Sequence, residues 1–253
     1  MEKLISLEGK KDKIKRAWIL GSNSGVAKSI CEELANLGCK YFFLISKDQK
    51  EGDKFADYLR NKFKINVVFK SYNLLNEFNS EVMQRLYSEN FDLYLITAGY
   101  LGSNSLAEQD DVEAMKIFKI NFIKISQWIN LITSKKRIQN RGRLWVFSSV
   151  AADRGRPSNY FYGSAKSGLE TFCEGVLLKC NKKPFSVRII KAGYMYTKMT
   201  TNKVPKFLCT DTKLIAKKLI KNIDKSGIEY SPYWWQIIMF IIKILPKSVV
   251  SRL

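Results

Sequence analysis

Short apolar segments alternate with helical segments along most of the chain, and this alternation constrains the fold more than any other feature. Six strands are expected, at Arg16–Leu20, Tyr41–Ser46, Asn66–Lys70, Leu93–Thr97, Arg143–Ser149 and Ser186–Lys191. Helical patterns separate them, from the turn after Gly21 to Leu37 and over Lys54–Phe63, Phe78–Ser88, Asp111–Thr133 and Ser158–Cys180. Such alternation builds βαβ units. We therefore predict an α/β fold, with one doubly wound parallel sheet in a three-layer αβα arrangement and a single domain over residues 1–253.

Composition limits the chemistry open to the chain. Of its 253 residues 46% are hydrophobic, which suffices for a large core, and no repeat or low-complexity linker divides the sequence. Histidine is absent, which excludes Ser-His-Asp hydrolysis and histidine-ligated metal sites. We expect no metal site.

The net charge of +20 calls for an anionic partner. The basic residues are dispersed over several segments, and lysine outnumbers arginine. A nucleic-acid-binding face would instead gather them into a patch or stripe. We therefore expect no nucleic acid partner, and favour a phosphorylated cofactor, a phosphorylated substrate or an anionic membrane surface.

Two features of the sequence bear on location. Residues 1–16 are charged throughout and lack the apolar core of a signal peptide. The five cysteines include no Cys-x-x-Cys pair, which suits reduced thiols in a reducing compartment. We expect a cytoplasmic protein, either free or peripheral on the inner face of the membrane.

A glycine-rich turn joins the first strand to the first helix and reads Gly-Ser-Asn-Ser-Gly-Val-Ala over residues 21–27. Glycine allows a close backbone approach, and the N-terminus of the helix offers unpaired N–H groups to a pyrophosphate. A plain strand–turn–helix connection is the alternative. The candidate cofactor-binding residues of this turn are Gly21, Ser22, Asn23, Ser24, Gly25 and Val26.

The end of the second strand addresses the type of dinucleotide. An acidic residue there would bind the ribose hydroxyl of NAD. The chain instead has Ser46 and Lys47, a hydroxyl and a cation that suit a 2′-phosphate, so NADP(H) is favoured and NAD(H) stays possible. Asp48 is the argument for NAD(H), because a shift of one or two residues in the alignment of this turn would place its carboxylate at the ribose.

Tyr162 and Lys166 lie one helical turn apart, and Ser149 ends a predicted strand thirteen residues upstream of the tyrosine. A phenol has a pKa of about 10, and we expect the neighbouring ammonium to lower it toward the working range. The serine hydroxyl could hold a carbonyl oxygen while the tyrosine protonates it. An exposed helix carrying an unrelated tyrosine and lysine is the alternative, which the serine and the glycine-rich turn disfavour.

Several of these residues lie at or just beyond the ends of predicted strands, namely Gly21, Gly99, Ser149 and Gly193. Ligands bind at the carboxyl ends of strands in doubly wound sheets. We therefore expect these positions to converge on one rim.

With these motifs in place, the chain resembles the short-chain dehydrogenases/reductases, a family with the Rossmann-type fold, over most of its length. The resemblance is carried by the turn at Gly21, Gly25 and Ala27, by Ala98-Gly99, by Asn121, by the Ser149, Tyr162 and Lys166 set, and by Gly193 and Thr197. Three positions depart from the family pattern: Thr97 and Asn73 replace an asparagine and an aspartate, and Ala192 replaces a proline.

The resemblance implies an oxidoreductase that reduces a ketone to a secondary alcohol, or the reverse. Tyr162 would be the general acid or base, Lys166 would lower its pKa and bind the nicotinamide ribose, and Ser149 would position the substrate oxygen. Asn121 would carry a water that relays protons to Lys166. Further cofactor contacts are implied at Asn73 with Leu74, Ala98 with Gly99, and Gly193 with Thr197. A non-catalytic nucleotide-binding scaffold associated with a membrane or a partner protein is the alternative function.

The stretch from Ser148 to Tyr160, including Arg154 and Arg156, and the aromatic tail are similar to a narrower group, the reductases of decaprenylphosphoryl 2-keto-pentose. A loop salt bridge is the other interpretation of these arginines. The tail, residues 233–253, is too short in its apolar part to span a bilayer. It is a buried final helix or subunit interface of a homodimer or homotetramer, an interfacial anchor with nearby lysines, or a wall of the substrate pocket.

Overall fold

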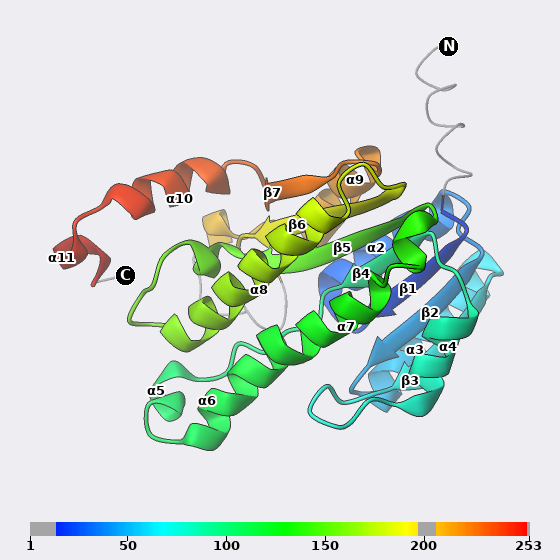
Figure 1. Cartoon of the computed structure of the whole chain (residues 1–253), viewed down its shortest axis with the longest axis horizontal. Coiled ribbons are helices and arrows are strands. Elements are labelled where there is room, and N and C mark those ends of the chain that lie inside the picture. Colours follow the sequence, from blue (N-terminus) through cyan, green and yellow to red (C-terminus); the bar gives the residue numbers. More distant parts are fainter. Residues whose placement is uncertain (1–13, 197–205, 252–253) are drawn as a thin grey trace, which may run out of the picture.

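The structure, a computed structural model, describes residues 14–196 and 206–251. Its centre is one sheet of seven parallel strands in the order β3-β2-β1-β4-β5-β6-β7 (Figure 1). The strands are β1 (Arg16–Leu20), β2 (Tyr41–Ser46), β3 (Asn66–Ser71), β4 (Leu93–Ile96), β5 (Gly142–Ser149), β6 (Phe185–Ala192) and β7 (Gly227–Ser231). The predicted doubly wound sheet is confirmed.

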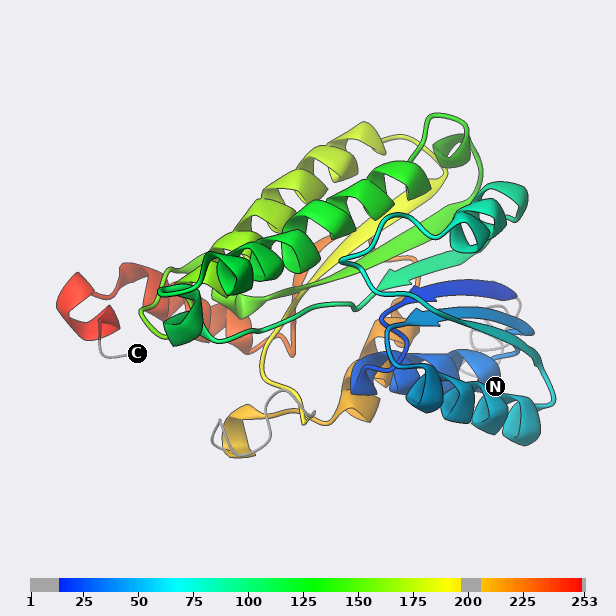
Figure 2. The ribbon, with the colours of Figure 1, turned by 90° about the horizontal axis from the view of Figure 1, so that it is seen from below.

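Helices cover both faces of the sheet (Figure 2). On one face lie α2 (Gly25–Asn36), α3 (Gln49–Phe63) and α9 (Thr212–Lys221). The other face carries α4 (Ser80–Ser88), α7 (Lys124–Ile132) and α8 (Tyr160–Lys179), with α5 (Asn104–Ala107) and α6 (Asp111–Phe118) packed beside α8.

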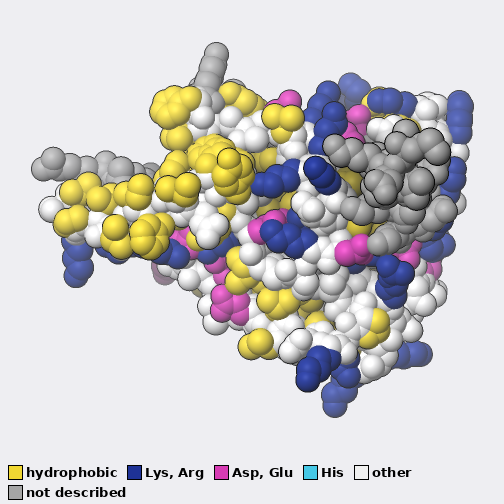
Figure 3. Space-filling view, turned by 90° about the horizontal axis from the view of Figure 1, so that it is seen from above, with side chains coloured by type: hydrophobic (Ala, Val, Ile, Leu, Met, Phe, Trp, Pro, Cys, Tyr) yellow, Lys and Arg dark blue, Asp and Glu magenta, His cyan; other side chains and the backbone are white. Residues whose placement is uncertain are grey.

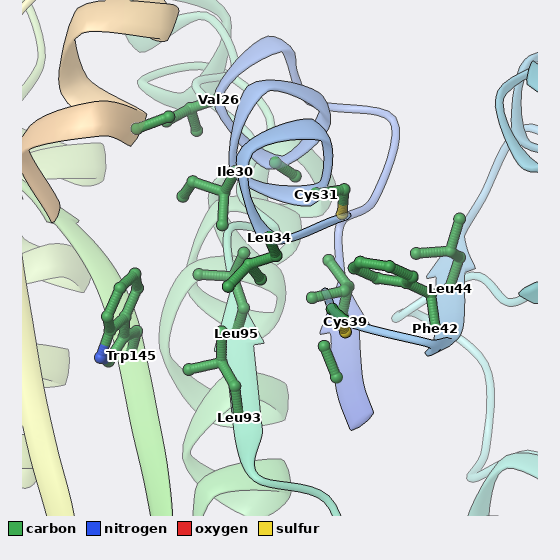
Figure 4. Packing of buried hydrophobic residues seen from close by; sticks show 14 of the residues in the cluster. Val26, Ile30, Cys31, Leu34, Cys39, Phe42, Leu44, Leu93, Leu95 and Trp145 are labelled. Atoms are coloured by element: carbon green, nitrogen blue, oxygen red, sulfur yellow. The ribbon is translucent and has the colours of Figure 1, made fainter. Parts of the chain in front are cut away.

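Each face of the sheet has its own core because successive strand residues point to opposite sides. In β1, Ala17 and Ile19 belong to the core beneath α2, whereas Trp18 and Leu20 belong to the core beneath α7. Figure 4 shows the first core, where side chains of α2 meet Phe42, Leu44 and Trp145. In the second core the Trp18 and Trp128 rings lie 5.5 Å apart. Burial on both faces explains the near-continuous apolar runs that made the strands predictable.

The six expected strands are all present, but a seventh, β7, was missed, and the long helix expected over Asp111–Thr133 is not uniform. It is interrupted by a π-helical turn at Lys119–Ile123 between α6 and α7. β7 escapes notice because its sequence, Gly-Ile-Glu-Tyr-Ser, is short and only partly apolar. It joins the edge of the sheet beside β6, with Ile190 opposite Glu229 in register.

A buried ion pair fastens β7 to β6. Arg188 is 1% exposed, and its Nε donates to Glu229 Oε1 at 2.6 Å while its Nη1 donates to the carbonyls of Leu219 and Asn222. Its guanidinium also lies 4.9 Å from the centre of the Trp145 ring. A buried guanidinium is tolerable only with such complete pairing, so Glu229 has a specific structural role.

The tail forms two helices, α10 (Trp235–Ile244) and α11 (Lys247–Val250). Trp235 and Met239 are buried against Val150, whereas Ile237 and Phe240 are exposed. Figure 3 shows hydrophobic side chains gathered at the end of the molecule that α10 forms. Among the residues that the structure describes, no helix combines the length and hydropathy needed to cross a membrane.

The Arg188 pair predicts a specific loss of stability. Glu229→Gln keeps the side-chain shape but removes the charge that balances a buried guanidinium, so the free energy of unfolding should fall by roughly 2–4 kcal/mol. Lys225 binds the same carboxylate from an exposed position, at 2.6 Å. Lys225→Gln is the matched control and should cost less than about 0.5 kcal/mol. Urea unfolding measures both, and equal losses would contradict this account.

Candidate active site

The strand ends converge as expected on one rim of the sheet. A cavity of about 500 Å³ lies there, and it is lined by Gly99, Ser149, Tyr162, Lys166 and Gly193 among others. A second cavity of about 380 Å³ adjoins it, lined by Gly21, Ser46, Lys47, Asn73, Leu74 and Ala98 among others. Ser24, Thr97 and Gly99 line both cavities. The two therefore form one elongated site across the strand ends.

The first glycine of the turn has no room for a side chain. Gly21 has φ +91°, and a Cβ there would lie 2.4 Å from the backbone nitrogen of Ala98. Its own N–H donates to Ile45 O at 2.8 Å, which holds the turn against β2. A phosphate-binding turn requires the same absence of a side chain, because the ligand must approach the backbone closely.

The N-terminus of α2 opens toward this site. Ser24 caps the helix, accepting from Ala27 N at 3.2 Å, and donates to Thr97 Oγ1 at 3.0 Å. Thr97 in turn donates to Gly21 O at 2.9 Å. Thr97 replaces the usual asparagine, and its hydroxyl nevertheless ties β4 to the glycine-rich turn.

Two polar atoms of the same turn have no hydrogen-bond partner among the described residues. They are Ser22 Oγ and Asn23 Oδ1, both buried. Asn23 Nδ2, by contrast, donates to Asp48 O at 3.0 Å. Unsatisfied polar atoms beside a helix N-terminus suit a polar, anionic ligand, so the turn fits the pyrophosphate of a dinucleotide.

Lys47 and Asp48 are neighbours in the sequence, but they differ in their relation to the second cavity. Lys47 lines it, whereas the Asp48 carboxylate caps α3 by accepting from Glu51 N at 2.8 Å. The capping bond explains why α3 begins at Gln49, five residues before the helical segment expected from the sequence. Asn73 Oδ1 accepts from Leu75 N at 3.1 Å, so this amide oxygen already shapes the loop after β3.

Tyr162, Ser149 and Lys166 all line the larger cavity. Tyr162 and Lys166 share one face of α8, with Lys166 Nζ 5.8 Å from the centre of the Tyr162 ring. Lys166 is 3% exposed and donates to Phe147 O at 3.2 Å. Ser149 Oγ accepts from Ala151 N at 3.1 Å, which holds the serine hydroxyl at the wall of the cavity that Tyr162 also lines. The three groups can therefore act on one bound carbonyl.

The electrostatics of the pair differ from the expectation. Burial raises the pKa of Tyr162 to about 12, and a hydrogen bond with Ser149 offsets only part of that rise. Burial also lowers the pKa of Lys166 to about 8, although Cys173 and Glu170 favour its charged form. The prediction that the ammonium lowers the tyrosine pKa was thus wrong for the protein without ligand, because desolvation dominates. The phenol is held protonated, as a proton donor must be.

Asn121 lies in the π-helical turn and is fully buried. Its Nδ2 donates to Tyr100 O at 2.6 Å and to Ile117 O at 2.9 Å, and its Oδ1 accepts from Tyr100 N at 3.0 Å. A Cβ on Gly99 would lie 3.2 Å from that oxygen and 3.7 Å from Lys166 Nζ. The π-helical turn therefore places the side-chain amide of Asn121 against the loop that follows β4, close to Lys166.

Gly193 is required by the tail. A Cβ at this position would lie 1.8 Å from Trp235 Nε1, so the indole covers the backbone directly. Tyr194 packs on the same indole with ring centres 5.4 Å apart. Thr197, the remaining predicted cofactor residue, lies outside the described residues.

A buried ion network behind the site was not foreseen. Lys191 pairs with Asp153 and, at 2.7 Å, with Glu170 of α8. Ser148 Oγ donates to Glu170 Oε1 at 2.6 Å. Asp153 also accepts from Tyr230 Oη at 2.8 Å and pairs with Lys243 at 3.0 Å. Separations of up to 90 residues hide such a network from local sequence patterns.

The family follows from this architecture and from direct comparison. The family model described as short chain dehydrogenase matches residues 15–207. The chain therefore belongs to the short-chain dehydrogenase family and has the Rossmann-type fold.

Individual relatives are more distant. An uncharacterized oxidoreductase of Mycobacterium tuberculosis is 28% identical over 160 residues, covering 63% of this chain and 64% of that protein. The match thus spans slightly less than two thirds of the mycobacterial relative. A 3-oxoacyl-(acyl-carrier-protein) reductase of Buchnera aphidicola is 26% identical over 190 residues, which cover 74% of this chain and 76% of the relative.

Solved structures share the fold at low sequence identity. A short-chain dehydrogenase from Sphingobium yanoikuyae in complex with NADPH has a TM-score of 0.78 at 15% identity, covering 92% of this chain and 97% of that one. A 7β-hydroxysteroid dehydrogenase also has a TM-score of 0.78, at 14% identity and with coverage of 92% and 94%.

The buried lysine predicts an unusual pH dependence of stability. The pKa of Lys166 is about 8 in the folded protein against 10.5 for a free lysine, so between these values the unfolded chain binds more protons. Its burial therefore costs stability below about pH 8, and the cost disappears as the pH approaches 10.5. Relative to Lys166→Met, the wild type should gain roughly 3 kcal/mol across this window. Chemical unfolding at several pH values measures it, and parallel profiles would refute the shift.

Proposed function

We propose that the chain is an NADPH-dependent reductase that converts a ketone to a secondary alcohol. The observation that carries the proposal is the meeting of Ser149, Tyr162 and Lys166 in the larger of two connected cavities. The smaller cavity and the turn at Gly21 would hold the adenosine and pyrophosphate parts of the cofactor. Bound NADPH would supply the hydride.

The roles of the side chains follow from their contacts. Ser149 would donate its hydroxyl hydrogen to the carbonyl oxygen in place of its hydrogen bond with Tyr162. Tyr162, whose pKa burial raises to about 12, is protonated at neutral pH and would donate a proton to the same oxygen as negative charge develops there. Lys166 would stabilise the resulting phenolate and bind the nicotinamide ribose. Asn121 would hold the loop after β4 in place and carry a water beside Lys166.

Lys47 supports the preference for NADP(H) over NAD(H). Its side chain lines the smaller cavity next to Ser46, while the Asp48 carboxylate caps α3 and is not among the residues that line this cavity. A cation and a hydroxyl suit a 2′-phosphate. NADPH in the solved Sphingobium relative agrees with this choice.

The substrate we propose is a keto-sugar carried on a polyprenyl phosphate. The stretch that joins Ser149 to Tyr162, with Arg154 and Arg156 in it, is similar in sequence to the reductases of decaprenylphosphoryl 2-keto-pentose. The apolar outer face of α10 would serve either a homodimer or homotetramer or a contact with the inner face of the membrane, in an otherwise cytoplasmic protein.

Tyr162→Phe separates the reductase from a nucleotide-binding scaffold. The substitution removes one hydroxyl, and NADPH oxidation with a ketone should fall at least about 100-fold because general acid catalysis is lost. Cofactor affinity, measured by fluorescence quenching, should change less than about threefold. Unchanged turnover would refute the enzymatic assignment.

Lys47→Ala tests the cofactor preference. Loss of the cation should raise the KM for NADPH about fivefold, equivalent to about 1 kcal/mol, and leave the KM for NADH unchanged. Lys50→Ala removes an equal charge three residues later, from a side chain that does not line the cavity, and should have little effect. If both variants weakened NADPH equally, the effect would be one of general surface charge.

A further inference from the structure

Arg156 is a buried cation in the wall of the larger cavity. It belongs to the loop between the 3₁₀ turn Val150–Asp153 and α8, which joins Ser149 to Tyr162. The residue is 8% exposed and lines the same cavity as those two side chains. An arginine stays charged at any pH that a protein survives, so a full positive charge is buried next to the reacting groups.

The guanidinium of Arg156 lacks a counter-charge within residues 14–196 and 206–251. Its Nε has no hydrogen-bond partner there, and none of the described carboxylates forms an ion pair with it. Two other buried arginines have a carboxylate partner: Arg143 pairs with Asp224, and Arg188 with Glu229. Arg137 is buried without a carboxylate, but its guanidinium donates to Tyr94 Oη and Leu86 O. An unpaired buried charge is costly, which is the expected state of a group awaiting an anionic ligand.

Neighbouring acids are already engaged. Asp153 pairs with Lys191 and Lys243, and Glu108 accepts from Tyr160 Oη at 3.0 Å. Residues 197–205 contain two lysines but neither aspartate nor glutamate, so they bring no carboxylate. The earlier interpretation of Arg156 as part of a loop salt bridge is therefore wrong for the described residues.

The cavity as a whole favours an anion. Among the described residues, its charged lining side chains are Lys28, Arg156 and Lys166 against Glu51, and Glu51 is bound to Lys28 at 2.8 Å. Asn159 lines the cavity too, and its buried Oδ1 has no partner among the described residues. An oxyanion at Arg156 and a hydroxyl donor at Asn159 would satisfy both groups.

We propose that Arg156 binds an oxyanion carried by the substrate, a phosphate ester or a carboxylate, and that Asn159 accepts a hydrogen bond from a hydroxyl beside it. The carbonyl to be reduced would then be anchored at a distance from its charged end. That the anion belongs to a ketone rests on the proposed function, whereas the anion site itself does not.

Binding of inorganic phosphate tests the site without turnover. Protein saturated with NADP⁺, so that the phosphate-binding parts of the cofactor site are filled, is titrated with phosphate by calorimetry. Wild type should bind phosphate, and Arg156→Gln should weaken binding at least about tenfold. Arg154→Gln is the matched control, because Arg154 lies in the same loop but donates to Lys243 O at 2.8 Å and does not line the cavity. Equal phosphate affinity in all three proteins would overturn the proposal.

Arg156→Lys, which keeps the charge, guards against misfolding. It should restore part of the affinity lost in Arg156→Gln, with circular dichroism confirming that all variants are folded. If phosphate competes with NADPH rather than with ketone, Arg156 is a cofactor contact and the proposal fails.

Turnover then identifies the source of the anion. Dihydroxyacetone phosphate is compared with dihydroxyacetone, acetoacetate with ethyl acetoacetate, and a short-chain prenylphosphoryl keto-pentose with the free keto-pentose. At least one charged ketone should exceed its neutral partner about tenfold in kcat/KM, and Arg156→Gln should abolish that ratio. Equal rates within every pair would overturn the proposal. Phosphate binding lost in Arg156→Gln, together with an absence of turnover on any ketone, would leave the anion site standing and refute the reductase.

Discussion

The ion network of Lys191, Asp153 and Glu170 holds the site together. It joins the end of β6, the turn after β5 and the middle of α8 at one buried point. Burial raises the pKa of Glu170, whereas hydrogen bonds from Lys191, Tyr230 and Lys243 outweigh burial and lower the pKa of Asp153. Three elements meet there in only one relative position, because a shift of any one would leave a charge unpaired away from water.

The consequence for catalysis lies in the register of α8. Tyr162, Lys166 and Glu170 occupy positions i, i+4 and i+8, and so lie on one face of the helix. Glu170 is bonded to Ser148, the neighbour of Ser149 on β5. Because Glu170 is held against β5, Tyr162 and Lys166 on the same helix face are also held in position relative to Ser149. The chemistry at one end of the helix depends on a salt bridge two turns away.

Sequence patterns predicted the fold well where burial alone determines the residue type. The strands buried on both faces were found, whereas β7, at the sheet edge, was missed because Gly227 and Glu229 interrupt its apolar character. The members of the candidate site could be chosen in advance because strand ends converge. Their electrostatics could not, since the pKa shifts of Tyr162 and Lys166 come from desolvation by the packed chain. Likewise, only the packed fold shows that Asp48 caps a helix and that Arg156 has no carboxylate partner among the described residues.

The tail shares residues with the walls of the site. Lys243 of α10 pairs with Asp153, Arg154 donates to the carbonyl of Lys243, and Trp235 covers Gly193. Thermodynamic linkage makes such a connection work in both directions. A ligand that stabilises the loop between Ser149 and Tyr162 through these contacts would also stabilise the position of α10. By the same coupling free energy, a molecule bound to the exposed face of α10 would change the affinity of the cavity for its ligand.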